Sequence, residues 1–182
     1  MRLFVGIPLN AEVRAELASA STPAISGVDG WQWAMAESWH ITLLFLGNTS
    51  HEKCEFLSAQ LRDLQCPAVP IQIDGLDFFE RAGIFYAGVS LFPELLALQR
   101  KVSDAATQSG FTPETRPYHP HITLARAKDR VRRPARRTFR KTLGECPNLS
   151  PFRAEEFLLF ESFLEPGGAR YEIRERFELT RT

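Results

Sequence analysis

Apolar and polar residues alternate along several short stretches of the chain, and longer stretches combine helix-forming residues with amphipathic spacing. Alternation predicts strands with one buried face, whereas apolar residues three and four positions apart predict helices. The sequence therefore predicts three helices, at about 10–20, 49–65 and 93–109, and strands at 2–9, 31–34, 39–47, 69–79, 83–91, from His121 onward, 154–164 and 169–179.

Capping and turn residues mark the ends of several of these elements. Asn10 is expected to cap the first helix, and Thr49 and Glu52 have the spacing of a capping box ahead of the second. Pro93 suits the first turn of the third helix. The segment 21–30 is rich in Ser, Pro and Gly and is expected to be a loop.

The order of the elements favours an α+β fold with antiparallel sheets. Strands outnumber helices, and the short connection at 81–83 reads as a hairpin. No Pro-, Gly- or Ser-rich linker divides the chain. We therefore expect one domain over residues 1–182, in which any two lobes pack closely together.

Bulk composition is that of an ordinary globular protein. Hydrophobic residues make up 44%, and 22 Lys and Arg balance 22 Asp and Glu, so net charge points to no partner. Three widely spaced cysteines (Cys54, Cys66 and Cys146) predict neither a disulfide framework nor a zinc site. The apolar run at the start is too short for a signal peptide, and no stretch approaches membrane-spanning length. A cytoplasmic protein with reduced thiols is expected.

The tetrapeptide His-Ile-Thr-Leu occurs twice in a chain with only four histidines, beginning at His40 and at His121. Side chains of a strand point alternately to opposite faces. In the first copy we therefore expect one face to carry His40, Thr42 and Leu44, and the core face to carry Ile41, Leu43 and Phe45.

The second copy has the same parity. His121 and Thr123 are expected to share one face, and Ile122 and Leu124 the face opposite. A single histidine in a strand is more often structural than catalytic. Two copies with matching parity and different flanks favour a functional role.

Paired imidazoles and hydroxyls suit reactions at a phosphate. Such reactions need a base for the nucleophile and an acid for the leaving oxygen, and imidazole, with a pKa of about 6.5, can serve as either. Each threonine hydroxyl can donate to a phosphate oxygen as negative charge grows there. Two such half-sites facing each other would need no metal or other cofactor.

The sequence resembles the two-histidine phosphoesterase superfamily, and within it the RNA 2′,3′-cyclic phosphodiesterases, also called 2′-5′ RNA ligases. The resemblance spans nearly the whole chain. It is carried by the opening RLFVGIPL, the first motif HITLLFLG, the second motif RPYHPHITLAR and the closing ESFLEPGGARYEIRERFEL. Together the paired motifs are specific, whereas either alone would be weak.

The resemblance implies a bilobal fold with pseudo-two-fold symmetry, in which two antiparallel sheets face a central groove and helices lie outside. It implies metal-independent hydrolysis of a terminal 2′,3′-cyclic phosphate of RNA to a 2′-phosphate. By the family's usual assignment His40 is the proton donor and His121 the proton acceptor, while Thr42 and Thr123 hold the phosphate. The reverse reaction would join RNA ends through a 2′-5′ linkage without ATP.

Arg126 follows the second motif, where the family tends to have a basic residue, so the resemblance implies a phosphate contact. Strict alternation places Arg126 on the face opposite His121, and it reaches the site only if the strand ends or bulges. Residues 126–141 carry nine Lys and Arg against Asp129, a local charge of 9 − 1 = +8. This stretch is either a solvated loop or a surface that steers RNA.

Several other residues have more than one interpretation. His119 and His121 could form a metal pair, although no Cys or carboxylate near them in sequence completes a site, and His51 is expected to be solvated. Five aromatic residues near the motifs could stack a nucleobase or pack in the core: Trp39, Phe45, Tyr118, Phe163 and Tyr171.

Two alternatives to the RNA phosphodiesterase remain open. The enzyme could open a small cyclic nucleotide or an ADP-ribose cyclic phosphate, which the basic stretch argues against. The protein could also bind RNA ends without catalysis, which the two intact motifs argue against. The expected partner is RNA with 2′,3′-cyclic phosphate ends, including tRNA fragments, and the expected state is a monomer that does not bind membranes.

Overall fold

The computed structural model describes residues 1–25, 30–112, 114–128, 149–165 and 168–180. In chain order, its elements are β1 (Arg2–Pro8), α1 (Ala11–Ile25), β2 (Trp31–Trp33), a short 3₁₀ turn (Ala36–Ser38), β3 (His40–Asn48), α2 (His51–Arg62), β4 (Val69–Ile71), β5 (Ile73–Phe79), β6 (Ile84–Val89), α3 (Pro93–Gln108), β7 (His121–Ala127), β8 (Phe152–Ala154), β9 (Glu156–Glu165) and β10 (Gly168–Glu178).

The strands confirm the predicted α+β class with antiparallel pairing. Eight of them form one sheet in the order β10-β9-β1-β3-β7-β6-β5, with β2 beside β7, while β4 and β8 form a small second sheet. The two halves of the large sheet meet in a single residue pair, Ile41 opposite Ile122, between β3 and β7. The strands predicted to form two facing sheets are therefore joined into one at this pair.

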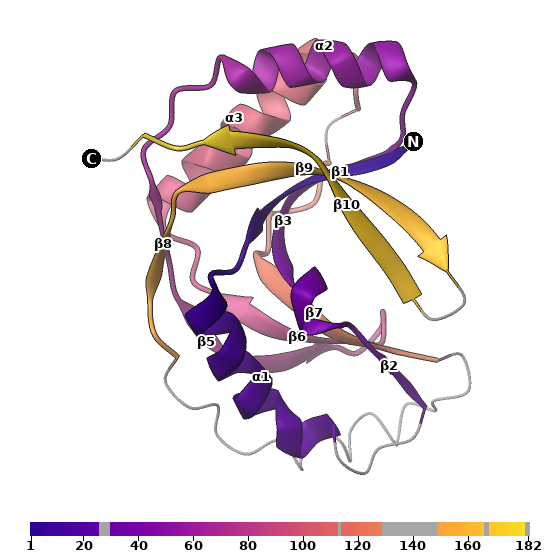
Figure 1. The fold of residues 1–182 in the computed structure, drawn as a ribbon, viewed down its shortest axis with the longest axis vertical. Coiled ribbons are helices and arrows are strands. Elements are labelled where there is room, and N and C mark those ends of the chain that lie inside the picture. The colour runs from indigo at the N-terminus through magenta and orange to yellow at the C-terminus, as the bar shows by residue number, and fades with distance from the viewer. Residues whose placement is uncertain (26–29, 113, 129–148, 166–167, 181–182) are drawn as a thin grey trace.

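The helices lie at the two ends of the molecule, with α2 and α3 together at one end and α1 at the other (Figure 1). One cluster of buried apolar side chains runs through both halves of the sheet and includes Ile41 and Ile122. A smaller cluster of Phe4, Leu158 and Phe160 packs separately. None of the helices in the described part of the chain is long and apolar enough to cross a membrane.

Asn10 caps α1 as predicted, because its Oδ1 accepts a hydrogen bond from the Val13 amide at 2.8 Å. The helix nevertheless continues to Ile25, into the segment predicted to be a loop. Ser21 explains part of the difference, because it is buried and its hydroxyl donates back to the Leu17 carbonyl at 2.8 Å. A serine bonded in this way continues the helical turn.

The cap of α2 is one residue later than predicted. Ser50, not Thr49, is the N-cap, and its hydroxyl accepts from the Lys53 amide at 3.3 Å. Thr49 is buried and its amide donates to the Met1 carbonyl at 2.7 Å, which keeps it with the strand ahead of the helix. The helix also ends earlier, at Arg62.

The predicted strand 69–79 is divided into β4 and β5, because its two parts have different partners. β4 pairs with β8, whereas β5 pairs with β6 through the predicted hairpin. Gln72 stands at the break, and its side-chain amide donates to the Leu149 carbonyl at 3.1 Å. The third helix begins at Pro93 as predicted.

Candidate active site

The two His-Ile-Thr-Leu copies begin neighbouring antiparallel strands. Ile41 lies opposite Ile122, and in an antiparallel pair the next residues along one strand face the preceding residues of the other. His40 is therefore beside Thr123, and Thr42 is beside His121. The two isoleucines are fully buried, so both imidazoles and both hydroxyls lie on the opposite face of the sheet.

A bulge in β3 changes the parity that alternation predicts after Thr42. Gly6 pairs with Thr42 and Val5 pairs with Leu44, which leaves Leu43 as an extra residue. Leu44 is consequently buried and Phe45 is 68% exposed. The predicted faces of Leu44 and Phe45 were therefore wrong.

The same bulge occurs in β7 and moves Arg126 to the histidine face. Tyr86 pairs with Thr123 and Phe85 pairs with Ala125, so Leu124 is the extra residue. Arg126 is exposed, and its positive charge contributes to lowering the pKa values of His40 and His121. Within the described part of the chain it forms no ion pair, so a positive charge without a carboxylate lies beside both imidazoles.

Backbone carbonyls fix the tautomer of both histidines in the same way. His40 Nδ1 lies 2.8 Å from the Ser38 carbonyl oxygen, and His121 Nδ1 lies 2.8 Å from that of His119. A carbonyl oxygen only accepts, so each Nδ1 carries the proton and donates it. Each Nε2 is therefore the nitrogen left to exchange a proton with a substrate.

Aromatic rings surround His40 and lower its pKa. The ring centroids of Phe4, Tyr171 and Phe160 lie 4.6, 5.2 and 5.6 Å from that of His40. Burial among them disfavours the charged imidazolium and lowers the pKa of His40 to about 4. Gly6 completes this packing, because a Cβ there would lie 3.3 Å from His40 Cδ2 and 3.0 Å from the Ile41 carbonyl oxygen.

His121 has a more open aromatic environment. Phe79 and Tyr86 stack on each other and lie edge-on to His121, with centroids at 5.0 and 5.5 Å. Burial is again the largest cause that lowers the pKa of His121, and the charge of His119 adds to it. Both imidazoles are therefore neutral at pH 7 in the unliganded protein.

Tyr118 ties the second motif to the first. Its hydroxyl donates to the Thr42 carbonyl at 3.0 Å, and burial raises the pKa of this phenol. The threonine hydroxyls themselves form no hydrogen bond within the described residues, so both remain available as donors to a ligand. Of the two roles left open for Tyr118, core packing is the one the structure favours, because its ring packs against the core and its hydroxyl is already hydrogen-bonded.

The remaining aromatic candidates differ in how much surface they present. Trp39 is buried, Tyr171 packs against His40, and Phe163 lies under the guanidinium of Arg170 at 4.5 Å from its ring centroid. Phe45 is the most exposed of them. Any of these that stacks a base must do so with the surface its neighbours leave uncovered.

The alternative roles of the other histidines can be compared with their positions. His119 is exposed beside Phe79 and Tyr86, and His51 is exposed and lies 3.2 Å from Glu55 on α2. In the parts of the chain that the structure describes, no three His, Cys, Asp or Glu residues gather as ligands for a metal ion. Most of the basic stretch 126–141 lies outside the described residues.

Sequence reasoning missed the residues that surround the histidines. Gly6 had a usable signal, because a glycine inside an apolar strand often marks a close approach of two parts of the backbone. No sequence signal marked the other neighbours of the histidines, because their contacts depend on how distant strands pair. These neighbours are Phe4, Phe160, Phe79 and Tyr86.

Comparisons with known proteins identify the family of the chain. Residues 31–160 match the family model of the 2′-5′ RNA ligase superfamily. A relative from Escherichia coli strain K12, an RNA 2′,3′-cyclic phosphodiesterase, is 30% identical over 98% of this chain and 97% of its own length. One of the same name from Geobacillus stearothermophilus is 34% identical over 68% of this chain and 41% of its own length.

Solved structures extend the likeness to the fold. The crystal structure of E. coli LigT complexed with 3′-AMP has a TM-score of 0.83 and 28% identity, and the match covers 98% of each chain. The Thermus thermophilus protein TT0787 has a TM-score of 0.79 and 26% identity over 98% of each chain. The chain therefore belongs to the 2′-5′ RNA ligase superfamily, as the paired motifs predicted.

Proposed function

We propose that the protein hydrolyses the terminal 2′,3′-cyclic phosphate of RNA to a 2′-phosphate, using two histidines and no metal. The observation that carries this proposal is the pairing of Ile41 with Ile122, which sets an imidazole beside a hydroxyl at each end of one short site. The activity named for the full-length relatives supports the choice of substrate.

In the proposed reaction β7 supplies the proton acceptor and β3 supplies the proton donor. His121 Nε2 takes a proton from water while the water oxygen forms a bond to phosphorus. The bond from phosphorus to the 3′ oxygen breaks, and His40 Nε2 gives that oxygen its proton. Thr42 and Thr123 donate to the non-bridging oxygens, and Arg126 offsets their negative charge.

His40 must gain a proton before it can act as the donor. In the free site, burial lowers the pKa of His40 to about 4, so the imidazole is neutral at pH 7. A bound phosphodiester anion favours the charged imidazolium and raises this pKa again. Substrate binding and protonation of His40 are therefore expected to be coupled.

We also propose the bilobal, pseudo-symmetric shape that the family resemblance implies. The β10-β9-β1-β3 half and the β7-β6-β5 half would act as two pseudo-symmetric lobes, with a groove along the histidine face where β3 meets β7. Running the reaction backwards, with a 5′-hydroxyl in place of water, would make a 2′-5′ linkage. We further propose a monomer acting in the cytoplasm on RNA ends, among them tRNA fragments.

The direct test is to incubate the protein with a short RNA ending in a 2′,3′-cyclic phosphate, in the presence of EDTA, and to identify the product. We expect a 2′-phosphate and turnover unchanged by EDTA. A divalent ion that restored activity lost to EDTA would contradict the two-histidine mechanism. Binding without turnover would favour an RNA-end-binding protein, and faster opening of ADP-ribose cyclic phosphate would favour the small-molecule enzyme.

A further inference from the structure

The reacting groups of the proposed site come from two strands that pair at one position only. β3 and β7 meet where Ile41 is opposite Ile122. Thr42 and His121 act on the same phosphate in the proposed reaction, and they belong to different strands of this pair. Their relative position therefore depends on what else connects the two strands.

Tyr118 supplies a further connection between the two motifs. It precedes β7, and its hydroxyl donates to the Thr42 carbonyl at 3.0 Å, across 76 positions of the sequence. Its half-buried ring packs against the core, and burial raises the pKa of the phenol. The hydroxyl therefore keeps its proton at neutral pH and well above it, so it remains a donor to Thr42.

The loop that carries Tyr118 also holds the proposed proton acceptor. The next residue, His119, accepts the Nδ1 proton of His121 on its carbonyl oxygen at 2.8 Å. The carbonyl of Pro120 accepts from the Val89 amide at 3.2 Å, which fastens the loop to the end of β6. Consecutive residues of one loop thus hold the acceptor imidazole and reach the first motif.

The bond reaches the backbone of β3 where the strand leaves regular pairing. Gly6 is opposite Thr42 and Val5 is opposite Leu44, so the bulge begins at the peptide group that contains the Thr42 carbonyl. A bulge changes the direction of the side chains beside it. Holding this carbonyl therefore helps to fix the direction of the Thr42 hydroxyl. Within the described part of the chain, no side chain is hydrogen-bonded to the carbonyl of Thr123.

We propose that Tyr118 is a positioning residue for the reaction. Its hydroxyl holds the backbone of Thr42, so that the Thr42 side chain is aimed at the phosphate on which His121 acts. The inference rests on the proposed function. Tyr118 itself transfers no proton and acts through Thr42.

Tyr118→Phe removes the hydroxyl and keeps the ring. We expect kcat on a cyclic-phosphate RNA to fall about tenfold with KM little changed, because a small displacement of a group that contacts the transition state lowers the rate. The shape of the pH profile should stay the same, since Tyr118 transfers no proton. Full activity of the folded variant, or a changed pH profile, would overturn the proposal.

Double variants test whether the effect passes through Thr42. In the Thr42→Ala background, Tyr118→Phe should lower kcat by less than about twofold more, because the group that it positions is already missing. In the Thr123→Ala background, Tyr118→Phe should keep its effect of about tenfold. Equal losses in the two backgrounds would indicate a general structural role and would overturn the proposal.

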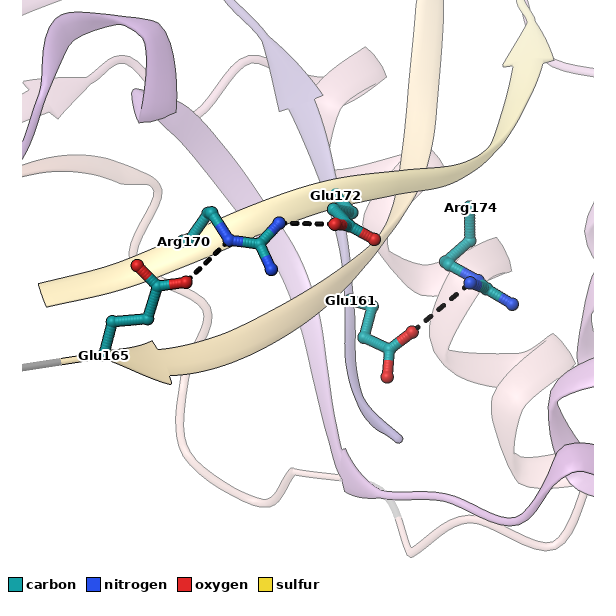
Figure 2. Close-up of polar contacts among 5 residues, drawn as sticks. All are labelled: Glu161, Glu165, Arg170, Glu172 and Arg174. Atoms are coloured by element: carbon teal, nitrogen blue, oxygen red, sulfur yellow. Dashed lines mark hydrogen bonds and ion pairs between the residues drawn. The ribbon is translucent and has the colours of Figure 1, made fainter.

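Glu161 provides the control for a loss of stability. Figure 2 shows this buried residue of β9 with its ion-pair partner Arg174, at 3.5 Å. The preceding residue, Phe160, contacts the His40 ring, so Glu161 points to the opposite face of the sheet. Glu161→Gln should lower the free energy of unfolding and leave kcat unchanged. If it lowered kcat as much as Tyr118→Phe does, the effect at Tyr118 would be one of stability alone.

Rescue by a conservative replacement tests the hydrogen bond itself. Tyr118→para-aminophenylalanine keeps a donor at the end of the ring and should restore kcat to within about threefold of wild type, because one hydrogen bond replaces another. A folded variant of this kind with the same loss as Tyr118→Phe would overturn the proposal.

A measurement without substrate separates this proposal from the proposed function. NMR three-bond couplings report the χ1 rotamer of Thr42, which should be single in the wild-type protein and averaged in Tyr118→Phe, while that of Thr123 stays unchanged. A Thr42 rotamer that Tyr118→Phe leaves unchanged would overturn the proposal. If the wild-type protein opened no cyclic phosphate, the proposed function would fail, while these couplings would still decide whether Tyr118 positions Thr42.

Discussion

The two His-Ile-Thr-Leu copies have the same backbone and different surroundings. Over six residues, from His40 and from His121, the pattern of buried and exposed side chains is the same. Each histidine donates Nδ1–H to the carbonyl two residues earlier, and each threonine is followed by a one-residue bulge. The repeated sequence therefore fixes where the reacting groups lie but cannot make them differ.

The difference begins at the sixth position of each copy. The bulges bring Phe45 and Arg126 to equivalent exposed places on the histidine face, one apolar and one positively charged. The neighbours also differ, because His40 is enclosed by the Phe4–Phe160 cluster and its pKa falls to about 4. The two like motifs thus differ in their packing and in one side chain, which gives the proposed proton donor and acceptor different surroundings.

The largest expected effect comes from removing either imidazole. His40→Ala and His121→Ala should each lower turnover of a cyclic-phosphate RNA by roughly 10²–10⁴-fold, the usual contribution of one general acid or base. The double variant should lose far less than the product of the two, because both groups act on one transition state. Steady-state kinetics on variants shown to be folded by circular dichroism measures this. If either single variant is folded and keeps full activity, the histidine it lacks has only a packing role.

The second-largest expected effect distinguishes Arg126 from Phe45, the sixth residues of the two copies. Arg126→Ala should lower kcat/KM by about 10- to 100-fold, because hydrogen bonds to a charged group contribute roughly 1.5–3 kcal/mol each. Arg126→Lys, which keeps the charge, should lose less. Phe45→Ala, at the equivalent place in the other copy, should change kcat/KM by no more than about threefold. Equal losses at Arg126 and Phe45 would show that the two half-sites are not specialised in this way.

The pH dependence of activity tests whether burial lowers the pKa values of both His40 and His121. Burial lowers both imidazole pKa values below 6.5, to about 4 at His40, so the free site is doubly neutral at pH 7. Catalysis needs one proton on the pair. We expect kcat/KM to peak on the acid side of pH 6.5, to fall by up to about tenfold per unit above it, and to fall again once both rings are protonated. A maximum above pH 8 would contradict the burial of the two rings.

The sequence predicted most of the strands, the shared face of each His and Thr, and the family, because two-residue alternation and the repeat depend only on local order. It did not predict β8 or the break between β4 and β5, which depend on pairing between distant segments. It could not predict the faces of Leu44, Phe45 and Arg126. One extra residue in a strand reverses every later side chain, and neither bulge carries a glycine to announce it. The environment of His40 could not be predicted either, because Phe160 is brought beside it by the pairing of β9 with β1.

The division of labour between the two histidines can be measured most directly with a changed leaving group. In an RNA whose terminal cyclic phosphate has sulfur in place of the 3′ oxygen, the leaving thiolate needs no proton donor, since a thiol has a pKa of about 8.5. We predict that this substrate restores His40→Ala to within about tenfold of wild type and leaves His121→Ala impaired. Restoration of His121→Ala instead, or of neither variant, would contradict the assignment of His40 as donor and His121 as acceptor.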